Sequence, residues 1–262
     1  ASRDPEATMV VMPADHVIGP DDVFQDALNH AAELVEEDPS RIVTFGIKPS
    51  YPAEAFGYIE RTGEALYQKR LPSFSVNRFR EKPDLETAKA FLEAGSFYWN
   101  SGIFVWKVKT ILAALQEFQP AMLARINTIA GTIGTPNFEE TLQREFCAIE
   151  GTSIDYAVME KHENVMVVEA PFQWDDLGNW SAIPRLKGMN ESGNTIAGDH
   201  IGINTENSLI RTEDGHLIVT IGMKDCIVVH TPNATLVADK SQEQSIKQVV
   251  AELESRGLDQ YL

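Results

Sequence analysis

Acidic and amide side chains gather in four short segments of this chain, each next to a run of apolar residues. The segments are residues 13–16, 78–84, 98–102 and 174–180. In open α/β sheets, ligands bind beyond the carboxyl ends of the strands, so side chains that follow strands are candidates for binding. Carboxylates and amides accept hydrogen bonds from sugar hydroxyls, and carboxylates also hold metal ions. These segments therefore favour recognition of a polar, phosphorylated ligand.

Three acids are candidates for holding a metal. Asp15 follows the apolar run 9–12, and Asp175 and Asp176 stand between two tryptophans. A Mg²⁺ site in proteins uses one or two carboxylates plus substrate phosphates, and Asp15 with Asp175 or Asp176 would supply the carboxylates. Each acid alone is also explained as a turn former or a helix N-cap.

A cluster of cations stands out in this acidic chain. Arg78, Arg80 and Lys82 lie within five positions in a protein of formal net charge −17. Glu81 beside Lys82 would combine an acceptor for sugar hydroxyls with a cation for a phosphate. A solvated hairpin edge explains the segment equally well when it is read alone.

Composition excludes several classes of protein. The 262 residues are 43% hydrophobic and 23% charged, as in soluble globular proteins. Nucleic acid is excluded as a partner, because a general nucleic-acid binder needs clustered Lys and Arg. No stretch approaches the ~20 apolar residues of a membrane helix, and residues 1–5 lack a signal peptide's apolar region, so we expect a cytoplasmic protein with no membrane partner. We expect Cys147 and Cys226 to be reduced and buried.

Strands and helices alternate through the first part of the chain. The apolar run 9–12 predicts a buried strand, 42–47 predicts the next, and Phe24, Leu28, Ala31 and Val35 predict a helix between them. This order favours a βαβ unit in a mostly parallel sheet. Further strands are expected at 57–60, 75–79, 103–106 and 164–170, with a helix from Asp84 to Gly95 and helical structure between 109 and 159.

The pattern changes after about residue 190. Short strands are expected at 209–211 and 217–219 around a turn at 213–215, then at 226–230 and 235–237, before a helix with Ile246, Val249, Val250 and Leu253 on one side. We therefore predict an α/β domain over 1–188 and a β-rich region over 189–262 that ends in this helix. We find no internal repeat. Exposed strand edges in the β-rich region suit a homodimer contact.

In their order and spacing, these motifs resemble the mannose-1-phosphate guanylyltransferase family, from about Met9 to Leu253. Single motifs such as Glu-Lys-Pro are shared with other sugar-nucleotide pyrophosphorylases, but six in this order are specific. They are residues 13–16, 57–59, 79–83, 99–102, 153–160 and 174–180, with 228–232 and 236–240 matching the tail.

The resemblance implies a Rossmann-like α/β fold and the transfer of GMP from GTP to mannose 1-phosphate, giving GDP-mannose and pyrophosphate. It implies that Asp15 and Asp176 hold Mg²⁺ and that Lys82 meets the sugar phosphate, so these three would be the catalytic residues. The sugar phosphate is the nucleophile, and no side-chain nucleophile is required. The residues implied to bind the sugar phosphate are Gly57, Glu81, Lys82 and Asn100.

Two departures from the family pattern matter. Glu54 and Phe56 stand where the family usually has Thr and Tyr, so we expect the detail of sugar recognition to differ. The family also opens with a glycine-rich loop whose backbone amides cradle the nucleotide phosphates, and nothing like it occurs in this sequence. We expect roughly the first hundred residues of the family pattern, including its first strands, to be absent from this chain.

Two other functions stay open. The chain would suit a pyrophosphorylase for another sugar 1-phosphate or for another nucleotide. The base-reading loop is not among its residues, so guanine is implied only by the resemblance. It would also suit a non-catalytic regulatory subunit that senses nucleotide sugars. The missing phosphate loop favours the sensor, whereas the presence of both Asp15 and Asp176 argues against it.

Overall fold

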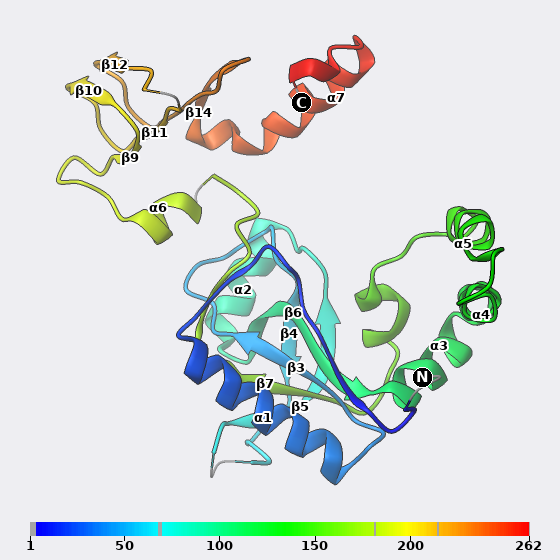
Figure 1. Ribbon diagram of the computed structural model, residues 1–262. Helices are drawn as coiled ribbons and strands as arrows, with labels where there is room; N and C mark the ends of the chain where they lie inside the picture. Colours follow the sequence, from blue (N-terminus) through cyan, green and yellow to red (C-terminus); the bar gives the residue numbers. More distant parts are fainter. Residues whose placement is uncertain (1–3, 68–69, 181, 214, 262) are drawn as a thin grey trace. The chain divides into compact units, whose positions relative to one another are not determined.

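The computed structural model describes residues 4–67, 70–180, 182–213 and 215–261 (Figure 1). The chain divides into two compact units, Ala1–Trp174 and Asp175–Leu262, and each is described by itself. The domain boundary predicted between residues 188 and 189 lies further along the chain, just beyond helix α6 (Ala182–Lys187). That boundary stays a prediction.

A six-stranded mixed sheet forms the centre of the first unit, in the order β1-β6-β3-β7-β5-β4. Among its described strands, β3 and β7 pair in parallel and the other pairings are antiparallel. The expectation of a mostly parallel sheet is therefore wrong. The strands are β1 (Thr8–Val11), β3 (Ile42–Ile47), β4 (Tyr58–Arg61), β5 (Ser73–Arg80), β6 (Phe97–Lys107) and β7 (Val165–Glu169).

The mixed sheet arises because β6 lies between β1 and β3 and is antiparallel to both. Strands β1 and β3 consequently still run in the same direction, as the βαβ pattern predicts, but they are not neighbours. A central strand that is buried on both faces gives a near-continuous apolar run whichever way it points, so its sequence carries no sign of direction. The carboxyl ends of β1, β3 and β7 meet at one edge of the sheet.

Strand β1 is less buried than its apolar sequence predicts. It forms the edge of the described sheet and pairs with β6 alone, so Val10 is 39% exposed and Val11 is 40% exposed. The expectation of a buried strand is wrong because a partner lies on one side only.

Helix α1 (Asp21–Glu37) runs along one face of the sheet, where Figure 1 shows it in blue. Its Ala31 and Val35 are fully buried, and Phe24 and Leu28 pack at the margin of the same core. The predicted apolar face is therefore confirmed. The core between helix and sheet also contains Ala27, Leu34, Val43, Phe45, Ile103, Val105, Met166, Val168 and Phe172.

The other helices of the first unit follow β5 and β6. Helix α2 (Leu85–Ala94) begins as predicted at Asp84, whose side chain accepts a hydrogen bond from the Thr87 amide at 2.8 Å. It ends at Gly95, whose φ of +66° is a conformation that glycine adopts most easily. The stretch predicted to be helical between 109 and 159 forms α3 (Val108–Phe118), α4 (Pro120–Ala130), α5 (Phe138–Cys147) and the π-helical turn η1 (Asp155–Met159).

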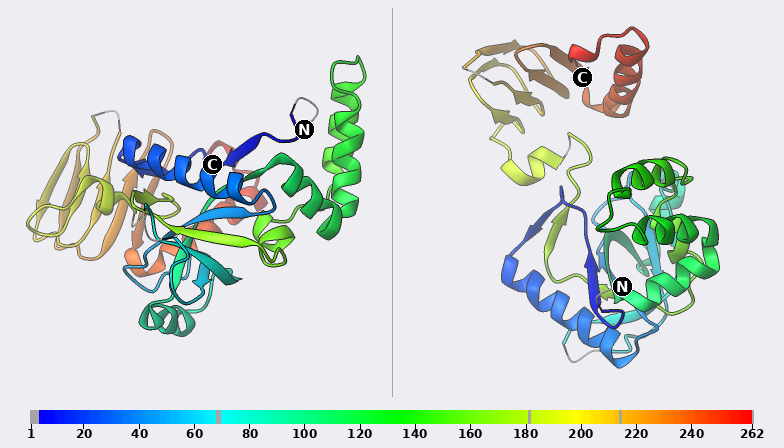
Figure 2. Two further views of the ribbon diagram at one scale, coloured as in Figure 1. Left: turned by 90° about the horizontal axis from the view of Figure 1, so that it is seen from below. Right: turned by 45° about the vertical axis from the view of Figure 1, so that its right-hand side comes forward.

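In the second unit, parallel strands stack in layers, coloured yellow to orange in Figure 2. Strand β11 (Leu209–Arg211) lies between β9 (Thr195–Ala197) and β13 (Cys226–His230), and β10 (His200–Ile203) pairs with β12 (Ile218–Ile221). In the β10–β12 and β11–β13 pairings, partner residues are 18 positions apart, as in His200 with Ile218 and Leu209 with Ile227. Strand β14 (Thr235–Asp239) closes the stack as an antiparallel partner of β13.

This layered coil corrects two expectations. The strands at 209–211 and 217–219 do not form a hairpin, because β11 and β12 pair in different sheets. Asp214, in the predicted turn, lies outside the described residues. The coil is also a structural repeat that the sequence did not reveal: what recurs is the alternation of aliphatic residues rather than their identity.

Three further expectations concern single side chains and helices. Cys147 is exposed and Cys226 is half-buried, and both are free, so the expectation of buried cysteines is wrong. Cys147 is the last residue of α5, a surface helix in which only Thr141 is buried.

Helix α7 (Ile246–Ser255) forms as predicted, although none of its residues is buried. Among the described residues, no helix is long and apolar enough to cross a membrane.

Candidate active site

Three of the residues implied to bind sugar lie together in the first unit. Asn100, in the middle of β6, donates its backbone N–H to the Gly57 carbonyl at 2.8 Å. Glu81 follows β5, and its Oε2 atom lies 2.7 Å from the position that a Cβ atom at Gly57 would take. Any side chain at position 57 would therefore displace the Glu81 carboxylate. A glycine there lets the carboxylate approach the backbone before β4.

Lys82 occupies the turn between β5 and α2. Its φ of +39° lies in the left-handed region, which a non-glycine residue adopts only when its surroundings impose it. The Nζ atom lies 3.1 Å from Glu81 Oε1, and the lysine side chain is 62% exposed. The ammonium group is thus held beside the carboxylate and remains open to a ligand. An acceptor and a cation next to one another can serve a hydroxyl and a phosphate of one molecule.

The side-chain amide of Asn100 is fixed at both ends. Its Oδ1 accepts a hydrogen bond from the Gly102 amide at 3.1 Å, and its Nδ2 donates to Asp155 Oδ1 at 2.8 Å. Burial, and then the nearby charge of Glu81, raises the pKa of the Asp155 carboxyl. Gly57, Glu81, Asn100 and Asp155 are called the sugar-side cluster below.

Asp155 was not singled out as a site residue from the sequence. It lies in the motif 153–160, which contributed to the resemblance without a role for any one residue. The available signal was one acid followed by the apolar run 157–159, whose three residues are all buried. A charged residue at the start of a buried turn needs a partner, and that need marks it for attention.

Asp15 lies in the loop after β1, on the carboxyl side of that strand. Its side chain is exposed and makes no hydrogen bond or ion pair with another described residue. The loop is held by its neighbours instead: Trp174 Nε1 donates to His16 Nδ1 at 3.0 Å, and Pro13 lies 3.6 Å from where a Cβ at Gly102 would be. Asp15 therefore keeps both carboxylate oxygens available.

The two adjacent acids of the second unit have different surroundings. Asp175 is 9% exposed and its Oδ2 pairs with Arg185 Nε at 2.6 Å, while its Oδ1 accepts from the Leu177 amide at 3.0 Å. Asp176 accepts from the Gly178 amide at 3.0 Å and has no ion-pair partner among the described residues. Of the two, Asp176 has the carboxylate better able to bind a cation.

The donor set suits a metal that brings ligands of its own. No group of three or more His, Cys, Asp and Glu side chains within the described ranges could hold an ion unaided. Mg²⁺ binds through one or two carboxylates and completes its shell with water and phosphate oxygens, so Asp15 and Asp176 are chemically suitable. They belong to different units, and their pairing stays a prediction.

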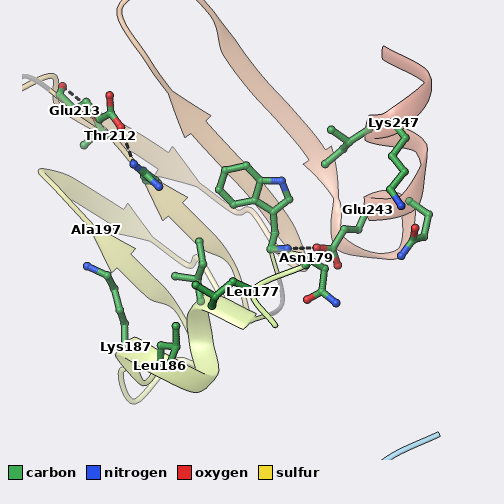
Figure 3. A pocket seen from close by; sticks show the side chains of 15 residues that line it. Leu177, Asn179, Leu186, Lys187, Ala197, Thr212, Glu213, Glu243 and Lys247 are labelled. Atoms are coloured by element: carbon green, nitrogen blue, oxygen red, sulfur yellow. Dashed lines mark hydrogen bonds and ion pairs between the residues drawn. The ribbon is translucent and has the colours of Figure 1, made fainter. Parts of the chain in front are cut away.

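A cavity of about 720 Å³ opens in the second unit, beginning one residue after Asp176 (Figure 3). Its walls combine apolar side chains from 177–186 with Ile246 of α7, and the Trp180 amide donates a hydrogen bond to Glu243 beside it. Lys187 and Lys247 are exposed at its rim. None of the residues implied to bind sugar lines this cavity, and the sequence did not predict it.

Comparison with protein families decides the classification. A family described as "Nucleotidyl transferase" matches residues 1–190, and one described as "MannoseP isomerase/GMP-like beta-helix domain" matches residues 198–253. The chain belongs to the nucleotidyl transferase family. The second match agrees with the layered coil, and nucleotidyl transferases generally use a divalent metal.

Curated relatives of this nucleotidyl transferase are similar along nearly its whole length. Mannose-1-phosphate guanylyltransferase of Escherichia coli K12 is 36% identical over 257 residues, covering 98% of this chain and 53% of the relative. The enzyme named ManC in Salmonella typhimurium LT2 is 36% identical over 255 residues, covering 97% of this chain and 52% of the relative. The chain thus spans about half the length of the curated relatives it matches.

A solved structure supports the fold. The crystal structure named mannose-1-phosphate geranyltransferase from Thermus thermophilus has a TM-score of 0.79 and 28% sequence identity, covering 94% of this chain and 70% of that one. An α/β nucleotidyl transferase fold followed by a β-rich region is therefore shared with a solved protein.

Proposed function

We propose that this nucleotidyl transferase acts on mannose 1-phosphate and GTP, transferring GMP to give GDP-mannose and pyrophosphate. The observation that carries the proposal is the sugar-side cluster, in which Gly57, Glu81 and Asn100 meet from separate elements. The curated relatives named mannose-1-phosphate guanylyltransferase support the same substrates.

Four residues of the candidate site have roles in this reaction. Glu81 and the Asn100 amide hydrogen-bond the sugar hydroxyls, and the small Gly57 leaves room for them. Lys82 binds the phosphate of the sugar and orients its oxygen for in-line attack on the α-phosphorus of GTP. The P–O bond to pyrophosphate breaks as the new P–O bond forms, so no protein nucleophile takes part.

Asp15 and Asp176 would hold the divalent metal, which we propose to be Mg²⁺. When bound, Mg²⁺ supplies positive charge that stabilises the transferring phosphoryl group. The two carboxylates would anchor the ion from the protein side, and phosphates and water would supply its other ligands.

Ligand binding is the first readout, because the family's phosphate-cradling loop is not among these 262 residues. Isothermal titration of the chain should show mannose 1-phosphate binding tighter than glucose 1-phosphate. Pyrophosphate release with Mg²⁺ and both substrates, against ATP and glucose 1-phosphate controls, then tests transfer. Equal binding of the two sugar phosphates would contradict the choice of mannose.

The proposal also includes self-association into a homodimer through the β-rich region. Ile201 pairs with Val219 and Ile203 with Ile221 on neighbouring strands β10 and β12. All four side chains are more than half exposed, at 52% for the least exposed of them. A contiguous apolar strip of this kind is typical of an interaction surface.

A further inference from the structure

The first residue of the π-helical turn η1 is Asp155, and such turns are frequent at functional sites. The Glu160 amide donates to the Asp155 carbonyl, five residues back, at 3.0 Å. The turn is anchored by residues 157–159, which are buried in the same core as Phe104 and Val167. The Asp155 carboxylate is thereby held rigidly beside Asn100.

The two oxygens of this carboxylate differ in their surroundings. Oδ1 accepts the hydrogen bond from Asn100 Nδ2 at 2.8 Å. No other residue in the ranges that the structure describes donates a hydrogen bond to Oδ2, although the backbone N–H of Asp155 itself also interacts with the carboxylate. Its charge also has no basic partner there, and the neighbouring charge of Glu81 is of the same sign. The carboxylate therefore still has lone pairs that can accept a hydrogen bond from a ligand.

We propose that Asp155 is a further sugar-binding residue, whose Oδ2 accepts a hydrogen bond from a sugar hydroxyl while its Oδ1 holds the Asn100 amide in place. The inference rests on the proposed function, because it assigns a contact within the same sugar site.

Charge and burial restrict what can bind at Oδ2. A phosphate or carboxylate would be repelled by Asp155 and Glu81, whereas a neutral hydroxyl donates a hydrogen bond to either. The partial burial that raises the Asp155 pKa also removes water from the carboxylate. A hydrogen bond from a sugar hydroxyl is therefore stronger there than it would be at an exposed carboxylate. The phosphate of the ligand belongs at Lys82, so the hydroxyl-bearing ring points from Lys82 towards Asp155.

The substitution Asp155→Asn separates the two oxygens. Its amide oxygen can still accept from Asn100, but the second oxygen becomes an N–H₂ donor. Titration of wild type and variant with mannose 1-phosphate, and with analogues that each lack one hydroxyl, forms a set of double-mutant cycles. We expect the variant to bind mannose 1-phosphate about 10-fold more weakly. One analogue should bind both proteins equally, because its missing hydroxyl is the one that Asp155 contacts.

Two outcomes would overturn the inference alone. If the variant binds mannose 1-phosphate as tightly as wild type, Asp155 does not contact the sugar. If the variant loses the same affinity for every analogue, Asp155 only positions Asn100. Wild type that binds no sugar 1-phosphate would overturn the proposed function as well. The matched control is Glu163→Gln, an exposed acid three residues beyond the same motif, and it should leave every affinity unchanged. If Asp155→Asn does not fold, Asp155→Ser offers Asn100 a smaller acceptor for the same cycles.

Discussion

Trp174 Nε1 donates a hydrogen bond to His16 Nδ1 at 3.0 Å, and the two rings meet edge to face with centroids 5.3 Å apart. Because Nδ1 accepts, the neutral His16 ring carries its proton on Nε2. The contact joins the loop that carries Asp15 to the last residue before Asp175 and Asp176. Asp15 itself bonds to no other described residue, so this hydrogen bond and the packing of Pro13 near Gly102 hold the loop.

The substitution Trp174→Phe should loosen that loop. It removes the indole donor and keeps an aromatic ring, so we expect the free energy of unfolding to fall by about 1 kcal/mol. His16→Asn keeps an acceptor near the Nδ1 position and should cost less. Urea denaturation measures both values, and an equal loss in the two variants would count against the hydrogen bond as the cause.

The substitution Gly57→Ala should weaken sugar binding without unfolding the protein. The new Cβ would stand 2.7 Å from Glu81 Oε2, so the carboxylate must move out of the cluster. We expect affinity for mannose 1-phosphate to fall by about 10-fold, measured by isothermal titration. Gly63→Ala is the matched control, because a Cβ there meets nothing within 4 Å. Similar affinities for the two variants would refute the role of close approach at Gly57.

Asp175 and Asp176 should respond differently to the same change. Asp175→Asn breaks the ion pair with Arg185 and should lower the free energy of unfolding by about 1–2 kcal/mol, since Arg185 is partly exposed. Asp176→Asn should leave stability near wild type and abolish the metal-dependent reaction. Urea denaturation, together with Mn²⁺ binding followed by electron paramagnetic resonance, separates the two effects. Normal Mn²⁺ affinity in the Asp176 variant would show that Asp176 is not a ligand of the metal.

The raised pKa of Asp155 predicts a pH-dependent stability. The Asp155 carboxyl binds its proton more tightly in the folded state than in the unfolded state, where its pKa is near 3.8. Ionisation of Asp155 therefore opposes folding. The cost is absent at pH below 3.8 and grows as pH rises through the raised folded-state value. The free energy of unfolding of Asp155→Asn, relative to wild type, should therefore increase from acidic to neutral pH. A difference that stays constant with pH would contradict this.

The apolar strip on β10 and β12 predicts self-association. Replacing Ile203 and Ile221, which face one another across the two strands, with Lys should place charges in the contact. Light scattering after size-exclusion chromatography should then report a monomer where wild type is a dimer. Leu66→Lys, at a similarly exposed apolar residue of the first unit, is the control and should leave the dimer intact.

Local patterns predicted the elements of the first unit well. The apolar face of α1 and the start and end of α2 depend on neighbouring residues, and each formed as expected. The meeting of Gly57, Glu81 and Asn100 depends on contacts distant in the chain. It was implied by resemblance, not by spacing, because three strands must pair before those residues become neighbours.

The failures have a common physical origin. Whether β6 runs parallel or antiparallel, and whether β1 has one partner or two, depends on pairing that a single strand does not encode. Asp175 and Asp176 are identical side chains in adjacent positions, and they are distinguished by the burial of Asp175 and by its ion pair with Arg185, ten residues away. Asp155 likewise could not be recognised from its own segment, because its place in the site depends on the hydrogen bond from Asn100 on another element.

The 18-residue spacing of the β10–β12 and β11–β13 pairings constrains how the length of these coils can change. Removal of a whole coil deletes one rung and leaves the inward and outward faces of the remaining rungs as they were. Loss of a single residue would turn every later side chain of that strand to the opposite face. Insertions and deletions tolerated in this region should therefore come in multiples of a coil, or be confined to the loops between strands.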